Sequence, residues 1–538
     1  MAQTATKREI TADVVIAGGS TAALAAAIAS ADSGAHTVLI EPTDWIGGQL
    51  TSSGVPPVDE AWHKIVEKQT GEVVLDVAKI ARDPRNMSPI LRDALKQIGN
   101  PGRGWVSRFC YQPKSLLENH LEPEVKRHSS RLVILRETVV KELEIDGQRL
   151  LALTAIRRTA NHPERSYSAL PSTEIPDWYS RVPSERFNKE IIRISGGKSV
   201  VFIDATEWGE LLALSGSSYL QGVELREGEL DGNDRCGQSV VFGFAQRLHA
   251  AASSDRAPEV QAVGLGLGKF AERVDAWRKI WTYRRLLGNG SGPTAGDITL
   301  QNWGYEPRVK NGGNDYPFGY IFLTRKDTAE TVNDWQGGVD LRVMAAAENR
   351  AYAWHHWLKR NAPEEFAPEQ ISLEYGVLGT SHGLSKLPYI RDTRRSIGLD
   401  GFILTINDLT GDARSKTGKT FHDRIAIGSY PADVHFLDNQ IYPSHIKEHR
   451  ETRPFYIPFR ALTHRDFDNL LVAGKTMAQS FMANSATRVH PVEWSSGTAA
   501  GVIAAFMASK NATTSEVLRS IEQVQKLIKA KTPIDWSF

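Results

Sequence analysis

Continuous apolar runs alternate with short glycine-rich breaks in the first part of the chain. Residues 14–16 form a run without a polar position, which predicts a strand covered on both faces of a sheet. Gly18 and Gly19 follow, and an alanine-rich stretch of helical length then leads to a second apolar run that ends at Glu41. The pattern predicts a strand, a tight turn, a helix and a second parallel strand, which together make a βαβ unit.

Two later segments show the same succession of strand, turn and helix. Residues 198–216 predict a buried strand that runs into a turn and a helix. Residues 469–477 predict a strand and a turn, and a helix of small residues is expected over 495–509. If both parts of the chain build one parallel sheet, the ends of these strands converge. The junctions lie at 14–23, 201–209 and 470–474.

The sequence between residues 217 and 380 has a different character, with helices separated by long connections rich in Gly, Asn and Pro. We therefore expect an α/β protein with a discontinuous Rossmann-like domain and a second, mixed α+β substrate or cap domain. The first domain takes residues 1–216, with a hairpin insert that turns at Asp146 and Gly147. The cap takes 217–380, and 381–538 returns to the first domain and adds C-terminal helices.

Composition narrows the classes of partner. The 538 residues include 64 basic and 63 acidic side chains, so no overall field attracts nucleic acid or an anionic membrane, and we expect neither as a partner. Cys110 and Cys236 form no CxxC motif, which excludes a redox-active dithiol. No apolar run reaches the length needed to span a bilayer and no signal peptide is visible, so a cytoplasmic protein is expected. Oligomeric state stays open.

The first turn has the chemistry of a dinucleotide site. A helix that begins at this turn directs unpaired N–H groups and its positive end at a pyrophosphate, and Glu41 can accept from ribose hydroxyls. The usual GxGxxG is altered to Gly18, Ser20 and Ala23, and Ser20 brings a Cβ to a place where glycine normally leaves room for phosphate. An ordinary strand-to-helix turn is the alternative.

Three convergent junctions suit a flavin better than a nicotinamide cofactor. A flavin needs donors near the ring edge that gains negative charge on reduction. Ser496, Gly497 and Thr498, placed at the start of the last small-residue helix, are candidates for those donors. The alternative is that these small residues only allow two helices to approach closely.

Several phrases, in this order, resemble one family: ADVVIAGGSTAALAAAIA, LIEPTDWIGGQLTSSG, VFIDATEWGELLALSG, LPYIRDTRRSIG, IAIGSYPADVH and NLLVAGKTM with SGTAAG. They are similar to FAD-dependent oxidoreductases of the glutathione-reductase-like superfamily, in the branch related to fumarate reductases and thiazole synthases. The resemblance covers residues 12 to 508. It implies an FAD-binding domain, and the absence of a histidine soon after Glu41 implies noncovalent FAD.

The resemblance also assigns roles to residues. The pyrophosphate faces the first turn, the ribose faces Glu41, the adenine half lies near Ala205 and Thr206, and Gly474 lies near the ribityl chain. Lys475 and Thr476 stand where many relatives carry an arginine or an acid, which puts the pyrophosphate contacts there in doubt. The expected cofactor-binding residues are Gly18, Gly19, Ser20, Thr21, Ala22, Ala23, Glu41, Trp45, Gly47, Gly48, Gln49, Ala205, Thr206, Gly474, Arg488, Ser496, Gly497 and Thr498.

Catalysis by hydride transfer also needs a group that takes a proton from the donor. His435 and His490 stand beside the flavin-proximal phrases and are the candidate bases, and a structural role is the alternative for each. Arg391, in a cluster with Asp392, Arg394 and Arg395, is a candidate anchor for substrate, and an interdomain ion-pair network is the alternative.

Two further groups of residues complete the candidates. Asn314, Asp315 and Tyr316 are expected either to line the substrate cleft or to form a turn. His355 and His356 are adjacent and should point in different directions, so no metal site is expected.

The residues and the resemblance together predict an FAD-dependent oxidoreductase that oxidises a small organic substrate by hydride transfer to the flavin N5. Whether it is an oxidase or a dehydrogenase stays open, as does the electron acceptor, oxygen or another. A flavin-dependent monooxygenase is the nearest alternative, although no second GxGxxG unit is visible for NAD(P)H. A tRNA-binding flavoprotein and a flavin-free scaffold are alternatives from other classes, and balanced charge weighs against the first of them.

Overall fold

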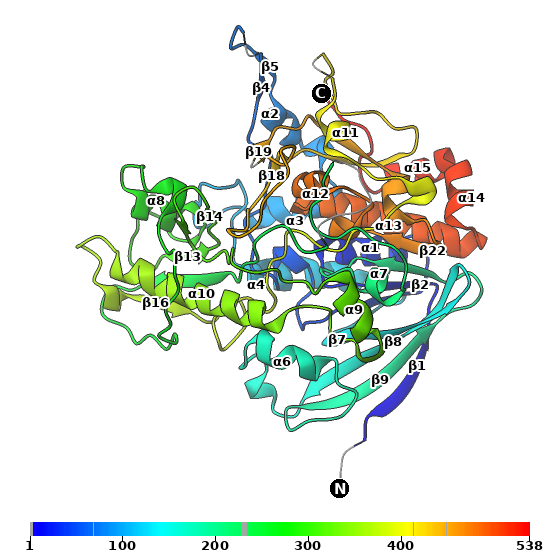
Figure 1. Ribbon diagram of the computed structural model, residues 1–538, viewed down its shortest axis with the longest axis horizontal. Coiled ribbons are helices and arrows are strands. Elements are labelled where there is room, and N and C mark those ends of the chain that lie inside the picture. The colour runs from blue at the N-terminus through cyan, green and yellow to red at the C-terminus, as the bar shows by residue number, and fades with distance from the viewer. Residues whose placement is uncertain (1–3, 68, 227–233, 413, 448) are drawn as a thin grey trace.

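The computed structural model describes residues 4–67, 69–226, 234–412, 414–447 and 449–538. Three sheets of four or more strands organise these residues, and helices cover the largest of them (Figure 1). No helix in the described ranges has the length and apolar character that a bilayer crossing requires.

The largest sheet has the strand order β21-β22-β10-β2-β3-β6. Its parallel strands are β2 (Val14–Ala17), β3 (Thr37–Ile40), β6 (Leu132–Leu135), β10 (Val201–Asp204) and β22 (Phe467–Val472), and β21 (Thr463–His464) is antiparallel at the edge. β10 pairs with β2 on one side and with β22 on the other. Segments more than 250 residues apart in sequence therefore share one sheet, which confirms the expected discontinuous Rossmann-like fold.

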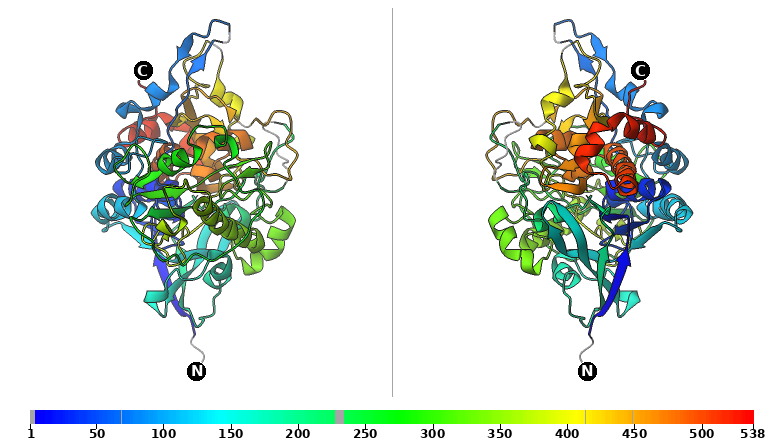
Figure 2. Two further views of the ribbon diagram at one scale, coloured as in Figure 1. Left: turned by 90° about the vertical axis from the view of Figure 1, so that its left-hand side faces the viewer. Right: turned by 90° about the vertical axis from the view of Figure 1, so that its right-hand side faces the viewer.

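Two helices made of small residues brace the sheet. α1 (Thr21–Asp32) follows β2, and α13 (His490–Lys510) lies against it in both ribbon views (Figures 1 and 2). A Cβ placed on Gly497 would lie 2.2 Å from the carbonyl oxygen of Ala22, and one on Gly501 would lie 2.2 Å from that of Ala26. The two backbones are in direct contact, and only glycine fits at both positions.

A second sheet has the order β1-β9-β8-β7 and contains the predicted hairpin. β7 (Thr138–Asp146) and β8 (Arg149–Ala160) pair antiparallel, and Gly147 in the turn between them has a φ of +54°. β9 (Phe187–Ser195) and β1 (Thr6–Thr11) complete this sheet.

The third sheet lies within the middle of the chain and has the order β12-β13-β11-β16. Its strands are β11 (Phe244–Leu248), β12 (Arg285–Leu287), β13 (Ile298–Gln301) and β16 (Ile371–Glu374), and the long helix α10 (Leu341–Arg360) runs beside it (Figure 1). It forms the additional, mixed α+β part that was expected.

The remaining helices and strands lie outside these three sheets and the three helices α1, α10 and α13. The other helices are α2 (Val77–Ala81), α3 (Pro89–Ile98), α4 (Pro113–Leu116), α5 (Glu122–Arg127), α6 (Pro171–Trp178), α7 (Glu210–Leu214), α8 (Ala276–Tyr283), α9 (Arg325–Thr331), α11 (Ile406–Thr410), α12 (Phe481–Thr487), α14 (Thr514–Arg519) and α15 (Ile521–Lys529). The other strands are β4 (Ile65–Val66), β5 (Val73–Leu75), β14 (Tyr305–Glu306), β15 (Asn311–Gly312), β17 (Arg424–Gly428), β18 (Ala432–Asp433), β19 (His449–Arg450) and β20 (Phe455–Pro458).

Candidate active site

The turn between β2 and α1 has free donors directed out of the helix. Ser20 is the N-cap: its Oγ accepts from the Ala23 N–H and donates to the Ala205 carbonyl. These two hydrogen bonds fix the position of the Ser20 side chain, which was expected to crowd a phosphate. The N–H groups of Thr21 and Ala22 make no hydrogen bond within the described residues, as is usual in the first turn of a helix.

A second glycine loop closes over this turn. Gly47 and Gly48 have φ values of +108° and +57°, and Thr21 Oγ1 donates to the Gly47 carbonyl. A Cβ on Gly48 would lie 2.6 Å from the Thr21 nitrogen, so any other residue would fill the space in front of the free N–H. The loop therefore forms a cradle of bare backbone, the kind of surface that a pyrophosphate approaches.

Glu41 directly follows β3 beside the turn and is 1% exposed. Its Oε1 accepts from the N–H and the hydroxyl of Thr43, at 3.0 and 2.9 Å. Burial raises the pKa of Glu41 to about 8, because a charged carboxylate is poorly solvated there. Donors that bind the free Oε2, such as ribose hydroxyls, would stabilise the charged form.

Polar atoms without partners gather behind the glycine cradle. The atoms Gln49 Oε1, Ser53 Oγ and Glu207 Oε1 are buried and have no hydrogen-bond partner within the described residues. Lys475 Nζ lies 2.5 Å from Glu207 and 3.1 Å from Glu493, and all three side chains are buried. Unpartnered buried groups are costly in a finished site. Gln49 Oε1 and Glu207 Oε1 can only accept hydrogen bonds, so they fit a cofactor that brings hydroxyl donors to this place.

The expectation for Ser496, Gly497 and Thr498 is wrong. α13 begins at His490, so these three residues lie in its second and third turns rather than at its start. Their N–H groups belong to the interior of the helix, and Gly497 packs against α1. Close helix packing, the alternative interpretation, is what the structure shows.

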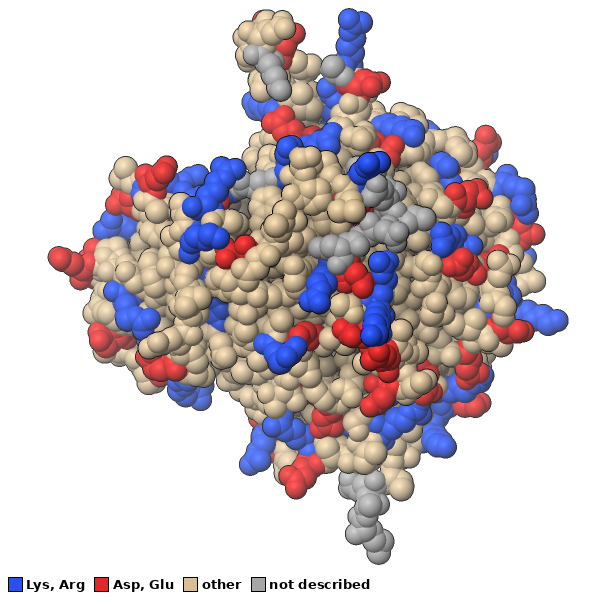
Figure 3. Space-filling view, viewed as in Figure 1, with Lys and Arg blue, Asp and Glu red and all other residues tan. Residues whose placement is uncertain are grey.

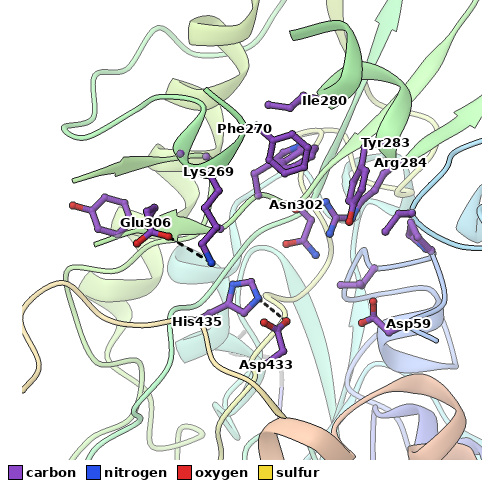
Figure 4. Close-up of a pocket in the computed structure, with 18 of the residues that line it drawn as sticks. Asp59, Lys269, Phe270, Ile280, Tyr283, Arg284, Asn302, Glu306, Asp433 and His435 are labelled. Carbon is purple, nitrogen blue, oxygen red and sulfur yellow. Dashed lines mark hydrogen bonds and ion pairs between the residues drawn. The ribbon is translucent and has the colours of Figure 1, made fainter. Parts of the chain in front are cut away.

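A cavity of about 720 Å³ opens between the middle segment of the chain, which contributes residues from 266 to 354, and loops that contribute residues from 55 to 62, 105 to 107 and 430 to 436. Figure 4 shows Tyr283 and Arg284 on one wall and Lys269 with Glu306 on another, and His435 and Asp433 lie at its base. Val55, which follows the glycine cradle in sequence, also lines it. The size falls within the range of ligand sites, roughly 300–1,000 Å³.

His435 lies between two carboxylates at this cavity. Its Nδ1 is 2.6 Å from Asp315 Oδ2 and its Nε2 is 3.3 Å from Asp433 Oδ2, the contact drawn in Figure 4. The charges of Arg391 and His435 hold the pKa of Asp315 at about 2, against its burial. The pKa of Asp433 is also held well below its usual range, because His435 and Arg488 outweigh burial. Both carboxyls are therefore charged at neutral pH.

Arg391 and Arg488 line the cavity beside this histidine. Arg391 Nη2 donates to Asp315 Oδ1 at 3.0 Å, and Arg488 Nη2 donates to the Asp433 carbonyl and lies 3.6 Å from Asp433 Oδ2. Asp315 is fully buried behind Arg391 and His435. The expectation that Asn314, Asp315 and Tyr316 line the cleft is therefore wrong, because none of the three is among the residues that line the cavity. The neighbouring Arg394 and Arg395 are fully buried in other contacts, with carbonyls and with Asp392 respectively.

His490 is not at the cavity. Its Nδ1 accepts from the Asp59 N–H at 3.2 Å, so its Nε2 carries the proton and donates to the Val55 carbonyl at 2.8 Å. Burial lowers the pKa of His490. Because both ring nitrogens are bound to backbone, this histidine fixes the loop of Val55 and Asp59 and has no nitrogen left for a substrate.

Other predicted positions lie around the turn. Thr206 binds Asp204, and the ring of Trp45 packs on Gly379 and within 4.7 Å of Lys386 Nζ. Gly474 has a φ of +68° and approaches Ala22. The cofactor contacts of Trp45, Gln49, Ala205, Thr206, Gly474 and Arg488 stay predictions.

The orientation of His355 and His356 in α10 differs from the one that we expected. His355 and His356 do not point in different directions: their ring centroids are 4.9 Å apart, and ligand atoms of both lie near Asp255. Among the described residues, Asp255, His355 and His356 form a group of side chains that could hold a metal ion. The same Asp255 oxygen is 2.7 Å from His355 Nε2 and 2.5 Å from the ammonium of Lys359, so the group is satisfied as an ion-pair network.

Sequence reasoning missed Asp433, Glu207, Glu493 and the burial of Lys475. Asp433 stands two residues before His435, a spacing that places both side chains on one face of an extended segment. The two-residue spacing is visible in the sequence and could have identified Asp433. No pattern of neighbouring residues could have shown that Glu207 and Glu493 both contact Lys475.

Glu41 gives a first prediction, on stability and pH. Its pKa is about 8 in the folded protein and about 4.5 when unfolded, so its stabilising protonation is complete below pH 4.5 and is lost as pH rises to 8. For the FAD-free protein, Glu41→Gln is expected to flatten the fall in Tm between pH 5 and pH 8. Thermal unfolding of both proteins measures this, with the exposed Glu185→Gln as control. An unchanged pH dependence in Glu41→Gln would contradict the assignment.

The sequence matches one family model. This model, described as FAD dependent oxidoreductase, matches residues 13–169 and 190–528. No curated protein matches the chain. Similar solved structures include quinol fumarate reductase FrdA from E. coli, with 13% identity over 96% of this chain and 74% of that one and a TM-score of 0.32. Another is p-nitrophenol 4-monooxygenase PnpA from Pseudomonas putida, with 11% identity over 98% and 88% and a TM-score of 0.31.

L-proline dehydrogenase from P. horikoshii is also similar, with 13% identity over 41% of this chain and a TM-score of 0.17, and the match spans a quarter (25%) of that protein.

The family model covers most of the described residues, including the glycine turn, Glu41, His435 and the helix α13. The chain therefore belongs to the FAD dependent oxidoreductase family, and it is an oxidoreductase whose cofactor is FAD.

Proposed function

We propose that the protein oxidises a small organic substrate at a carbon that bears a hydroxyl or amino group, and that His435 takes the proton from that group. The observation that supports this best is the Asp315–His435 pair at the cavity, with a 2.6 Å contact. The substrate loses a hydride from carbon and a proton from oxygen or nitrogen, and a C=O or C=N bond forms. When bound, FAD supplies the two-electron acceptor for the hydride.

The charges around His435 suit a proton acceptor. Asp315 is paired with Arg391, and Asp433 lies near Arg488, so each of the two acids has an arginine as well as the histidine for a partner. Asp315 orients the ring through Nδ1, and Nε2, which lies 3.3 Å from Asp433 Oδ2, is the nitrogen that takes the substrate proton. Once the proton has arrived, both carboxylates stabilise the imidazolium.

The cavity and the cofactor cradle share walls. Tyr389 lines the cavity, its hydroxyl accepts from Arg488, and its ring centroid is 5.3 Å from Lys475 Nζ. Gln49, next to the glycine cradle, donates to the Arg488 carbonyl at 3.0 Å. A substrate at His435 would therefore lie one side chain away from the group of polar atoms that fits FAD.

Anaerobic mixing with candidate donors tests the proposal. Bleaching of the flavin absorbance by a donor, without NAD(P)H, is the expected result. A protein that needs NAD(P)H and oxygen and returns a hydroxylated product would instead be a monooxygenase. No bleaching by any amine, sugar or hydroxy acid would overturn the proposal.

The tRNA-binding alternative has its own test. On the face in Figure 3, Lys and Arg alternate with Asp and Glu, and no continuous basic track is visible there. We expect no gel shift with total tRNA at low salt. A tight complex whose affinity falls steeply with salt would support tRNA as a partner.

A further inference from the structure

We propose that the cavity binds a sugar ring and that the oxidised carbon is one of its CH–OH groups. This inference rests on the proposed function and names its substrate class. Three features of the cavity support it: the tryptophans at its rim, the aromatic rings that hold them, and the mixture of donors and acceptors on its inner walls.

Both exposed tryptophans of the protein lie at this cavity. The chain has 13 tryptophans, all within the described residues, and only Trp62 and Trp105 are exposed, at 50% and 47%. They come from separate loops, yet both line the same space. Exposing a large aromatic surface to water is unfavourable, so its concentration at one opening indicates a binding surface.

Inner aromatic rings hold each tryptophan in place. Trp62 packs edge-to-face on Tyr430, with centroids 5.1 Å apart, and Trp105 packs in the same way on Tyr283, at 4.4 Å. Tyr283 in turn contacts Trp303. These rings offer fixed flat surfaces, and the polarised C–H bonds of a sugar face pack favourably on the negative face of an aromatic ring.

Hydrogen-bonding groups lie between the two aromatic sets. Arg284 stacks near Tyr283 and donates one N–H to the Asn302 carbonyl, and no ion pair of this guanidinium is found within the described residues. Asp59 lines the same cavity, and no ion pair of its carboxylate is found within the described residues. Figure 4 shows Asp59 below Tyr283 and Arg284. Planar groups of this kind bind neighbouring hydroxyls with two hydrogen bonds.

Ion pairs within the protein take up part of the charge that lines the cavity. Glu60 is paired with Arg108, Glu306 with Lys269, and Arg391 with Asp315. Asp59, Arg82, Arg273 and Arg284 also line the cavity, and no ion pair of theirs is found within the described residues, so they offer one acceptor group and three donor groups to the ligand. A polyhydroxyl ring can bind donors and acceptors alike, and it also uses the aromatic surfaces, which a small amino acid would leave uncovered.

The reaction on this substrate balances. The C–H and O–H bonds of one CH–OH group break and a C=O bond forms, so the sugar loses two electrons and two hydrogens. The proton goes to His435 Nε2 and the hydride to FAD. A soluble artificial dye, used as the two-electron oxidant, closes the cycle in the assay.

The test measures sugar binding and oxidation separately. Calorimetry on FAD-loaded His435→Ala follows binding of glucose, galactose, xylose, cellobiose and maltose, and anaerobic bleaching of the unaltered protein follows oxidation. Trp62→Ala and Trp105→Ala are each expected to weaken sugar binding and raise KM about two- to tenfold while kcat stays unchanged. Phe538→Ala is the control, because Phe538 is 56% exposed and lies outside the cavity.

The outcomes separate this inference from the proposed function. If a hydroxy acid such as lactate, an amino acid such as alanine or another amine bleaches the protein and no sugar binds or bleaches it, the proposed substrate class is wrong and the proposed function stands. If no donor of any class bleaches it, the proposed function itself fails. Unchanged sugar affinity in both tryptophan variants, with an unchanged Tm, would overturn the role of the rim.

Discussion

Replacing His435 by alanine is expected to slow the anaerobic bleaching of bound FAD by its substrate about 10²–10⁴-fold, the usual contribution of a general base. The imidazole lies at the cavity with one nitrogen on Asp315, so its removal leaves no imidazole to take the proton of the substrate hydroxyl. FAD content should not change, because the glycine cradle and Glu41 are untouched. Stopped-flow absorbance measures the rate, and the flavin-to-protein absorbance ratio measures the content.

Two variants make this result specific. His422→Ala removes a histidine whose side chain is 69% exposed and should leave the rate unchanged. Asp315→Asn keeps the size of the side chain but loses the charge that orients His435, so kcat should fall and the pH profile of kcat should move, with FAD retained. A normal bleaching rate in His435→Ala would remove this histidine from the mechanism.

Replacing Gly497 by valine is expected to separate α1 from α13 and to release FAD. The new Cβ would lie 2.2 Å from the Ala22 carbonyl oxygen, and backbone cannot give way as a side chain can. Overpacking of a tight contact costs about 1–3 kcal/mol and more where backbone must move, so a loss of about 3 kcal/mol or more is expected. Thermal unfolding and the FAD content of the purified protein measure the two effects.

Gly197→Val is the matched control, because nothing lies within 4 Å of a Cβ at Gly197. It should retain FAD and show nearly the Tm of the unaltered protein. If Gly497→Val were as stable as this control and equally yellow, the helix contact would not support the cofactor turn.

The sequence pattern predicted the sheet because buried parallel strands read as unbroken apolar runs. Residues 14–16 and 470–472 show such runs, and glycines mark the turns after both. The predicted start of this helix at residue 495 is wrong, because a run of small residues does not by itself mark where a helix begins. Pro491, in the first turn, is the better start signal, since proline fits there without losing a hydrogen bond.

The candidate site was predictable only in part. His435, Arg391 and Asp315 were recognised by residue type and neighbourhood, but their mutual contacts join residues 76 and 120 positions apart. No local period encodes such pairs. His490 looked equivalent in sequence, and only the fold shows that backbone N–H and C=O groups take both of its ring nitrogens.

The contact between α1 and α13 has a consequence for biosynthesis. The first turn leaves the ribosome early, but the helix that braces it comes from residues 490–510, and the strand β22 that pairs with β10 comes from residues 467–472. A nascent chain that has not yet exposed these segments has neither the closed sheet nor the supported cradle. FAD loading must therefore follow translation of nearly the whole polypeptide, and chains that end prematurely before α13 should accumulate without flavin.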